Sequence, residues 1–128
     1  MMKRINWHRL FFIIYLIILI KIITANYPAL GNNFTLFREI LRYQFLSPLF
    51  IRNVIGNVIL FIPLGFYLAY FYKINKIYLI LIISFIISLM IEVIQFHIGR
   101  AFDVDDILLN VIGGLIGYFL YQIFKRLE

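Results

Sequence analysis

Four long apolar runs restrict the fold of this chain more than any other feature. They cover residues 10–23, 51–72, 77–98 and 107–124. A helix needs about 20 apolar residues to cross a hydrocarbon core of roughly 30 Å, and each run approaches that length. Because a backbone in hydrocarbon must satisfy its own hydrogen bonds, the runs are expected to be helical. The fold class predicted is an all-α membrane protein, a bundle of four transmembrane helices. The expected helices span about 9–25, 51–72, 77–98 and 104–124.

Composition supports this class and excludes several others. Of 128 residues, 64% are hydrophobic and only 14% are charged, whereas a soluble domain carries about a quarter charged residues. The length fits a single domain, 1–128. The absence of cysteine excludes disulfides and thiolate metal sites. The net charge of +6 does not indicate nucleic acid, because the basic residues lie at the ends of apolar runs. Such residues are typical of topology signals and of contacts to anionic lipid.

The first apolar run has two interpretations. Basic residues precede it and Thr24-Ala25 follows it, as in a secretory signal peptide. However, Ile23 is a poor residue three positions before such a cleavage site, and Lys21 interrupts the end of the run. We favour an uncleaved helix.

Lysine and arginine counts predict the orientation. With a cytoplasmic N-terminus, seven of them lie inside and five outside. The tight hairpin with Lys73 and Lys76 falls on the same side as the basic N-terminus (Lys3, Arg4) and the basic C-terminus. Because cytoplasmic loops carry the excess of basic residues, both termini are predicted to be cytoplasmic.

Residues 26–50 form the one sizeable connection, on the outer side in this topology. Its apolar residues recur at helical spacing: Leu36, Phe37, Ile40, Leu41 and Phe45. Charged residues occupy the other arc, and the pattern ends before Pro48. The segment is therefore either a short amphipathic helix at the interface or an ordinary packed loop.

Several polar side chains fall at one common depth in the predicted bundle. At about 1.5 Å per residue, Asn57, Glu92 and Asn110 each lie roughly 6–8 Å from the midpoint of their runs toward the outer surface. Spacings of three and four add further residues to the same helix faces: Asn53, Gln95, Asp103 and Asp106. The turn 97–100 can return Arg100 toward the carboxylates, whereas Asp105 falls off this face and is expected to face water. Polar groups are costly in hydrocarbon, so their convergence predicts a site.

Most of these residues also have an ordinary structural explanation. Asp103 and Asp106 suit the N-terminus of a helix, as a cap and as first-turn charge. The two asparagines can hydrogen-bond between helices. Glu92 is different, because it lies inside an apolar run where no cap or turn requires a carboxylate.

Glycines near the site suggest close packing of helices. Gly113 and Gly117 form a small-xxx-small face on the last helix, with Gly114 beside it. Pro63 and Gly65 either kink the second helix or relax its packing.

The same residues carry a family resemblance. Residues 57–65, N-V-I-L-F-I-P-L-G, resemble the N-x-x-x-F-x-P-x-G segment of VanZ-like membrane proteins. Residues 92–114 resemble the E-x-x-Q … R … D-x-x-D-x-x-x-N-x-x-G signature of that family. The resemblance covers 53–118, about half of the chain. The family often has a second basic or small polar residue before the first aspartate, where this chain has Ala101 and Phe102. Arg100 is then the one basic candidate in the turn.

The resemblance implies a small multi-pass protein of the bacterial cell membrane. The family's namesake is associated with resistance to the lipoglycopeptide teicoplanin. The resemblance therefore implies a role in the cell envelope, with glycopeptide tolerance carried over by analogy alone.

The first functional hypothesis is action at the outer face on a cell-envelope lipid or lipid-linked precursor. Glu92, Asp103 and Asp106 are the catalytic candidates, as general acid or base. Asp103 and Asp106 are also candidate ligands for Mg²⁺ or Ca²⁺, which prefer oxygen. The candidate substrate-binding residues are Arg100, Asn57, Gln95 and Asn110, with the guanidinium suited to an anionic head group.

Two other functions stay open. The protein could bind or shield an antibiotic or an envelope lipid without chemistry. It could instead be a subunit of a small ion or lipid transporter, although four helices are few for alternating access and the polar cluster lies on one side.

Overall fold

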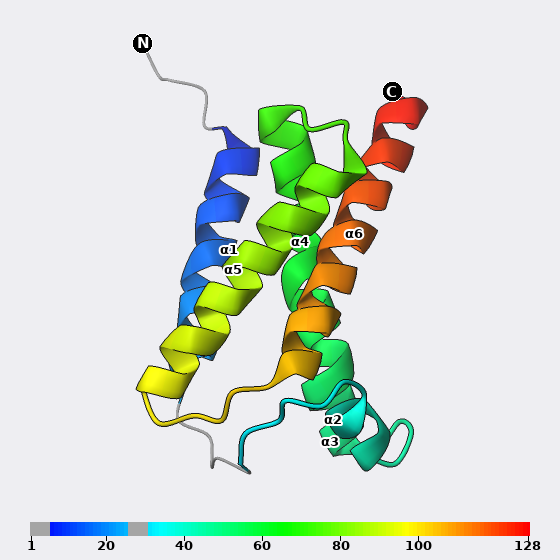
Figure 1. Cartoon of the computed structure of the whole chain (residues 1–128). Helices are drawn as coiled ribbons and strands as arrows, with labels where there is room; N and C mark the ends of the chain where they lie inside the picture. The colour runs from blue at the N-terminus through cyan, green and yellow to red at the C-terminus, as the bar shows by residue number, and fades with distance from the viewer. Residues whose placement is uncertain (1–5, 26–30) are drawn as a thin grey trace.

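The computed structural model describes residues 6–25 and 31–128, and helices dominate it (Figure 1). In chain order these are α1 (Trp7–Thr24), α2 (Arg38–Arg42), α3 (Pro48–Phe50), the π-helical turn η1 (Ile51–Ile55), α4 (Gly56–Tyr72), α5 (Ile77–His97) and α6 (Val104–Leu127). Four helical spans are long and apolar enough to cross a membrane: Trp7–Thr24, Pro48–Tyr72, Ile77–His97 and Val104–Leu127. The predicted class, a membrane protein with four transmembrane helices, is confirmed.

The second span begins earlier than its apolar run predicted, at Pro48 and not at residue 51. The Ser47 hydroxyl caps this start by accepting a hydrogen bond from the backbone N–H of Phe50 (3.2 Å). Proline fits the first turn of a helix, where its missing N–H would have had no partner. The π-helical turn η1 then lies between this start and α4, and hydropathy carries no signal for it.

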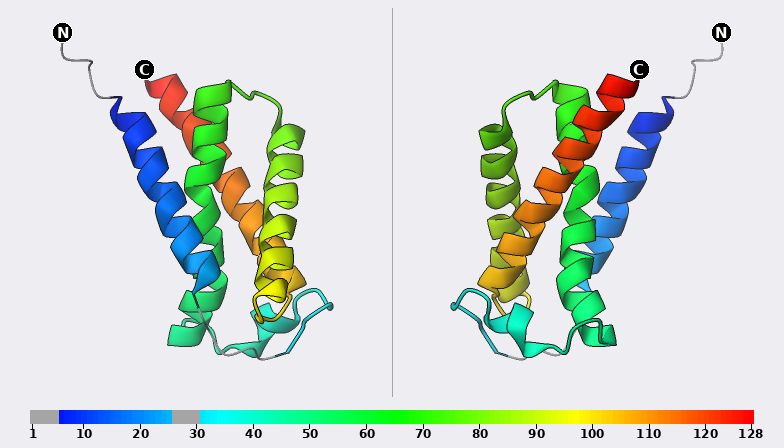
Figure 2. Two further views of the ribbon diagram at one scale, coloured as in Figure 1. Left: turned by 90° about the vertical axis from the view of Figure 1, so that its left-hand side faces the viewer. Right: turned by 90° about the vertical axis from the view of Figure 1, so that its right-hand side faces the viewer.

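The helices define two ends of the molecule (Figure 2). At one end, called here the hairpin end, α1 begins, α6 ends and residues 73–76 join α4 to α5. The opposite end, the loop end, carries the segment 31–47 and the turn 98–103 (Figure 1). The predicted basic N-terminus, with Lys3 and Arg4, lies outside the described residues. That the hairpin end is cytoplasmic stays a prediction.

Glycines bring α4 and α6 into backbone contact. A methyl group at Gly117 would collide with the backbone of Ile62 and Phe66, and one at Gly65 would collide with the backbone of Gly114. The small-xxx-small interpretation is therefore confirmed, and Gly65 serves packing. Such contact lets helices associate by van der Waals packing where no hydrophobic force acts between them.

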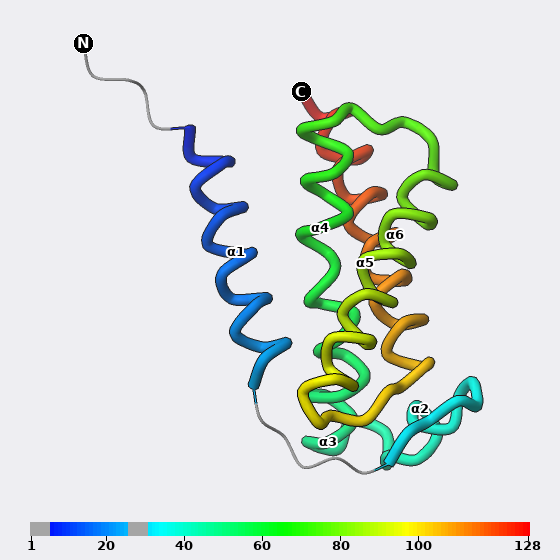
Figure 3. The backbone as a smooth tube through the Cα atoms, turned by 60° about the vertical axis from the view of Figure 1, so that its left-hand side comes forward, coloured from blue at the N-terminus to red at the C-terminus, as the bar shows by residue number. Residues whose placement is uncertain are grey.

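Helix α1 stands at the side of the other three helices (Figure 3). Leu19 is its one buried residue among those described. Near the hairpin end, the ring of Phe12 contacts the rings of Tyr67 (5.2 Å between centroids) and Phe71 (5.7 Å). Further along, the Tyr15 hydroxyl donates to the carbonyl of Leu60 (2.8 Å). A few defined contacts thus fix α1 to α4.

The connection between α1 and the second span contains, within residues 31–47, a helix of only five residues, α2. Leu41 and Phe45 are exposed there, at 81% and 74% of their surface. Within residues 31–47 the segment therefore includes a short helix with exposed apolar residues, and a position at the membrane interface stays a prediction.

A substitution of Gly117 tests the contact between α4 and α6. Gly117→Ala should destabilise the protein by about 1–3 kcal/mol, because the added methyl group forces two backbones apart. Thermal melting in detergent should show a lower Tm. Gly56→Ala is the matched control, since its added Cβ would lie 3.6 Å from the Ile51 carbonyl oxygen, which is an ordinary van der Waals contact. An unchanged Tm for Gly117→Ala would contradict the packing described.

Single cysteines test the orientation, because the chain has none of its own. Leu41→Cys, at the loop end, should react with a membrane-impermeant maleimide in intact cells. Asn75→Cys, in the hairpin, should react only after the membrane is permeabilised. The reverse pattern would overturn the predicted topology.

Candidate functional site

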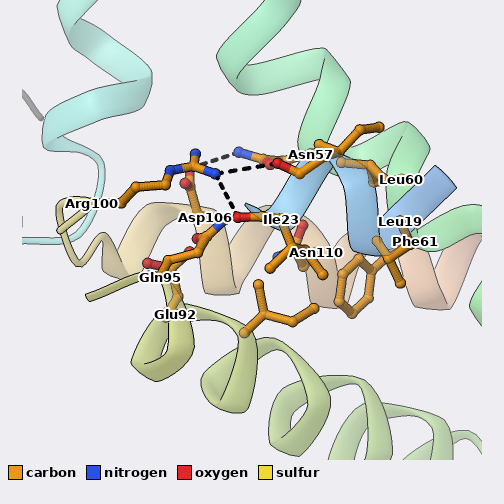
Figure 4. Close-up of a pocket in the computed structure, with 12 residues that line it drawn as sticks. Leu19, Ile23, Asn57, Leu60, Phe61, Glu92, Gln95, Arg100, Asp106 and Asn110 are labelled. Carbon is orange, nitrogen blue, oxygen red and sulfur yellow. Dashed lines mark hydrogen bonds between the residues drawn. The ribbon is translucent and has the colours of Figure 1, made fainter. Parts of the chain in front are cut away.

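The structure brings the predicted polar residues together around one small chamber near the loop end (Figure 4). Six of the seven candidate site residues line it: Asn57, Glu92, Gln95, Arg100, Asp106 and Asn110. They come from α4, α5, α6 and the turn before α6, and α1 adds apolar side chains. The chamber has a volume of about 50 Å³ and is lined by both polar and apolar groups. Their convergence is a fact of the fold, whereas their roles stay predictions.

Glu92 lies at the centre of this arrangement and is 1% exposed. Its Oε2 accepts a hydrogen bond from the backbone N–H of Asp103 (2.9 Å), which joins α5 to the start of α6. Gln95, one turn later on the same face, lies between Glu92 and Arg100. With its amide nitrogen toward Glu92 Oε1 (3.2 Å) and its oxygen toward the guanidinium (2.8 Å), both contacts are hydrogen bonds. The Gln95 amide thus bridges the Arg100 guanidinium and the buried carboxyl group of Glu92 by hydrogen bonds.

Arg100 also ties the end of α1 to the site. Its Nη1 donates to the carbonyl oxygens of Ile22 (3.3 Å) and Ile23 (3.1 Å) in the last turn of that helix. Terminal carbonyls have no partner within their own helix, and a cation is favourable beside them. The same guanidinium therefore contacts α1 and lines the chamber (Figure 4).

Asn57 connects α4 to α6. Its Nδ2 donates to Asp106 Oδ1 (2.7 Å) and to the carbonyl of Asn53 (2.7 Å). The predicted pairing of a polar residue on each helix is therefore present in atomic detail, and it holds the Asp106 carboxylate against the chamber wall.

Asn110 connects α6 to α5 through a residue that sequence reasoning missed. Its Nδ2 donates to Ser88 Oγ (2.9 Å), and Ser88 is fully buried. Its Oδ1 accepts no hydrogen bond from the described residues. The chamber beside it is large enough for an ordered water, which can satisfy such an atom.

A polar stripe on α5 could have revealed this connection. Ser84, Ser88, Glu92 and Gln95 follow each other at spacings of four, four and three within an apolar run, and all are buried. That spacing places them on one helix face. A serine changes the hydropathy of an apolar run very little, so hydropathy marks only the last two residues of this stripe, Glu92 and Gln95.

Asp105 corrects an expectation, because it is fully buried and does not face water. Its carboxylate accepts hydrogen bonds from the backbone N–H groups of Phe37 (2.6 Å), Glu39 (2.7 Å) and Ile40 (3.3 Å). Phe37, the residue before α2, makes no side-chain cap of its own. Since the first N–H groups of a helix need an acceptor, Asp105 supplies the cap from another segment. Helical periodicity on α6 could not reveal a partner so distant in sequence.

Asn33 fixes the start of the loop to the start of α6. Its backbone N–H donates to the carbonyl of Phe102 (2.7 Å), and its carbonyl accepts from the N–H of Val104 (3.1 Å). Its side-chain Nδ2 donates to Asp103 Oδ1 (2.9 Å). Asn33 is 2% exposed, and no sequence pattern marked it as a site residue.

Asp103 caps α6 as predicted, since its Oδ1 accepts from the backbone N–H of Asp105 (2.8 Å). Burial raises the pKa of the Asp103 carboxyl group above its ordinary value, against the opposing effect of the hydrogen bond from Asn33. Its side chain is therefore engaged with the loop and the helix start, beside the chamber.

The comparison with protein-family models decides what kind of protein this is. The VanZ/LLP1 model matches residues 12–125, which include every residue of the chamber. The chain belongs to the VanZ/LLP1 family. It is 35% identical over 80 residues to Protein VanZ of Enterococcus faecium, a match that covers 59% of this chain and 47% of that protein. The chain thus spans about half the length of this curated relative. No solved structure matches it.

The structure shows what surrounds Asp103 and Asp106, the two predicted metal ligands. Among residues 6–25 and 31–128, no three histidine, aspartate or glutamate side chains are placed to share a metal ion. Asp103 and Asp106 instead accept hydrogen bonds from Asn33 and Asn57. Mg²⁺ is commonly held by one or two carboxylates together with waters and substrate phosphates, so the role of this pair as metal ligands stays a prediction.

Removal of the Asp105 carboxylate should release the loop of this VanZ/LLP1 protein. Asp105→Ala leaves three backbone N–H groups without their acceptor, so trypsin should cut after Arg38 and Arg42 faster than in the wild type. Mass spectrometry of the digest in detergent measures the rate. Asp105→Asn keeps one acceptor oxygen, so its cleavage rate should lie between those of the wild type and Asp105→Ala. Equal cleavage rates in all three proteins would show that Asp105 does not hold the loop.

Proposed function

We propose that this VanZ/LLP1 protein acts at the outer face of a bacterial membrane on a cell-envelope lipid or lipid-linked precursor. The proposal includes a contribution to tolerance of glycopeptides such as teicoplanin, by analogy with the family's namesake. One observation carries it: a buried carboxyl group, Glu92, lies within a membrane-spanning helix and is joined through Gln95 to Arg100 in the turn that follows. Buried ionisable groups at such depth are costly and mark functional sites.

The chemistry of the chamber fits an anionic head group beside a proton-handling carboxyl group. A guanidinium binds phosphate or carboxylate oxygens with directed hydrogen bonds, as Arg100 can do at the chamber wall. Glu92 and Asp106 line the same wall and supply a general acid and base. Asn57 orients Asp106, and Gln95 orients Glu92 and Arg100, through the hydrogen bonds described above. Asn110 lines the same chamber and is itself held by Ser88.

The charges at the opposite end support the outer face as the side on which the site acts. The hairpin with Lys73 and Lys76, and Lys125 with Arg126 at the end of α6, all lie at the hairpin end. Basic residues favour the cytoplasm, which directs the chamber to the outer leaflet.

A second candidate is binding or shielding of an envelope lipid or antibiotic without chemistry. This candidate is favoured because the carboxyl groups already have hydrogen-bond partners within the protein. Asp106 accepts from Asn57, and Glu92 accepts from the backbone N–H of Asp103. Groups held this firmly form a rigid recognition surface. Capture of a lipid by the purified protein, with products sought in parallel, separates the two: a product supports chemistry, and capture alone supports shielding. A transporter subunit ranks last, because the cluster occupies only the loop end.

The decisive variant is Glu92→Gln, which keeps the shape and removes the proton. In a susceptible Gram-positive host that expresses the protein, the variant should reach the membrane in normal amounts. Its minimal inhibitory concentration of teicoplanin should fall to that of cells without the protein. Glu128→Gln, at the exposed end of the chain, is the control and should behave as wild type. If Glu92→Gln gives full teicoplanin tolerance, Glu92 has no proton-handling role. If the wild type itself gives no tolerance, the proposed role in glycopeptide tolerance is wrong.

A further inference from the structure

A cleft much larger than the chamber lies between α1 and the second span. Its volume is about 860 Å³, and it shares Asn57, Leu60 and Arg100 with the chamber. Ligand sites in proteins commonly enclose about 300–1,000 Å³, so a substantial molecule fits here. We call it the lateral cleft.

The lateral cleft is polar at one end and apolar at the other. Toward the loop end it is lined by charged and amide groups, including Arg52, Asn53 and Arg100. Toward the middle of the bundle it is lined by Tyr15, Ile18, Ile59 and Pro63. The ten helical steps from Asn53 to Pro63 correspond to roughly 15 Å along a helix, which is about half of a hydrocarbon core. The cleft therefore has the polarity gradient of one lipid leaflet.

The rim of the cleft is open to the side of the bundle. Ile18 on α1 and Ile59 on α4 line it, and they expose 50% and 57% of their surface. Both lie within the membrane-spanning helices, so their exposed surface faces acyl chains. Figure 3 shows α1 standing apart from α4 along this side. A ligand that reaches the cleft between these two residues comes from the bilayer.

The loop contributes the wall on the aqueous side. Gly31, Glu39 and Tyr43 line the cleft there. Glu39 accepts hydrogen bonds from Arg42 (2.9 Å) and from the Tyr43 hydroxyl (2.9 Å), while its backbone is pinned by Asp105. Burial and the hydrogen bond to Glu39 raise the pKa of Tyr43 to about 12, so its hydroxyl keeps its proton at neutral pH. This wall is thus built from a connected network.

The charges along the polar end have both signs. Two guanidiniums, of Arg52 and Arg100, line the cleft together with three carboxylates, of Glu39, Asp103 and Asp106. Arg42 already pairs with Glu39, so a head group with a single negative charge would meet two guanidiniums and the carboxyl groups of Asp103 and Asp106. A phosphate joined to an ammonium group complements both, because guanidinium binds phosphate and carboxylate binds ammonium.

We propose that the lateral cleft binds a membrane amphiphile that has a hydrocarbon chain and a zwitterionic phosphate–ammonium head group. The amphiphile enters sideways from the bilayer, between Ile18 and Ile59, and its head group reaches Arg100 beside the chamber. This inference rests on the proposed function and specifies its substrate class and its route.

Photo-crosslinking of the full chain in lipid nanodiscs tests the inference. The probes are phosphatidylethanolamine, phosphatidylglycerol and diacylglycerol, each with a diazirine in the same acyl chain. The zwitterionic probe should label the segment around Leu60, inside the cleft, several-fold more than the other two. Stronger labelling by phosphatidylglycerol, or equal labelling by diacylglycerol, would overturn the head-group assignment. No cleft labelling by any probe would overturn entry from the bilayer.

Matched tryptophan variants test the entry route. Ile18→Trp and Ile59→Trp enlarge the side chains at the rim, and each should lower cleft labelling several-fold. Ile17→Trp is the control, because Ile17 is the preceding residue of α1, is 51% exposed and does not line the cleft. Equal labelling of all three variants and the wild type would contradict the route.

The two proposals fail separately in these experiments. If Glu92→Gln abolishes tolerance while no probe enters the cleft, the lateral route is wrong and the proposed function stands. If the probes enter as expected while Glu92→Gln keeps full tolerance, the cleft binds lipid and the proposed role of Glu92 is wrong.

Discussion

The backbone contact between α4 and α6 is the constraint on which the site depends. Glycines at 65, 113 and 117 remove the side chains that would separate the two helices, and Gly114 leaves room for Ser84 of α5. Only at this separation does Asn57 reach Asp106 with a 2.7 Å hydrogen bond. In hydrocarbon such a hydrogen bond stabilises the association of two helices only modestly. Its loss is costly, however, because it leaves a buried polar group without a partner. The close packing at the glycines is therefore also what allows the polar side chains of α4 and α6 to find their hydrogen-bond partners.

The second constraint is that a buried carboxyl group must be surrounded before the helices can tolerate it. Glu92 is surrounded by the backbone of Asp103 and by Gln95, and Gln95 reaches Arg100. Each partner comes from α5 itself or from the turn that follows it. The α5–α6 turn is thus part of the site, and its conformation depends on the loop through Asn33 and Asp105. The aqueous loop and the membrane-embedded cluster form one network.

Much of this could be predicted from the sequence, and the reasons for the rest are physical. Hydropathy located the four spans, and the rise per residue placed Asn57, Glu92 and Asn110 at one depth, because both are properties of single helices. The cap at Asp105 was missed because its partners lie about 65 residues away, and periodicity reports nothing about such contacts. Ser88 was missed because a serine barely changes hydropathy. The lateral cleft depends on where α1 stands, which no single-helix property fixes.

The π-helical turn at Ile51–Ile55 has a consequence for how this protein can change over evolution. Such turns contain one residue more than the α-helical path would need, and they occur often at functional positions. An α-helix turns by about 100° per residue, so a deletion here would rotate everything before it by roughly that angle relative to the glycine-packed segment. Arg52 and Asn53 would then leave the face they share with Asn57. Among relatives, insertions and deletions in this short stretch would change which polar side chains face the cleft, while the glycine-packed part of the helix bundle stays the same.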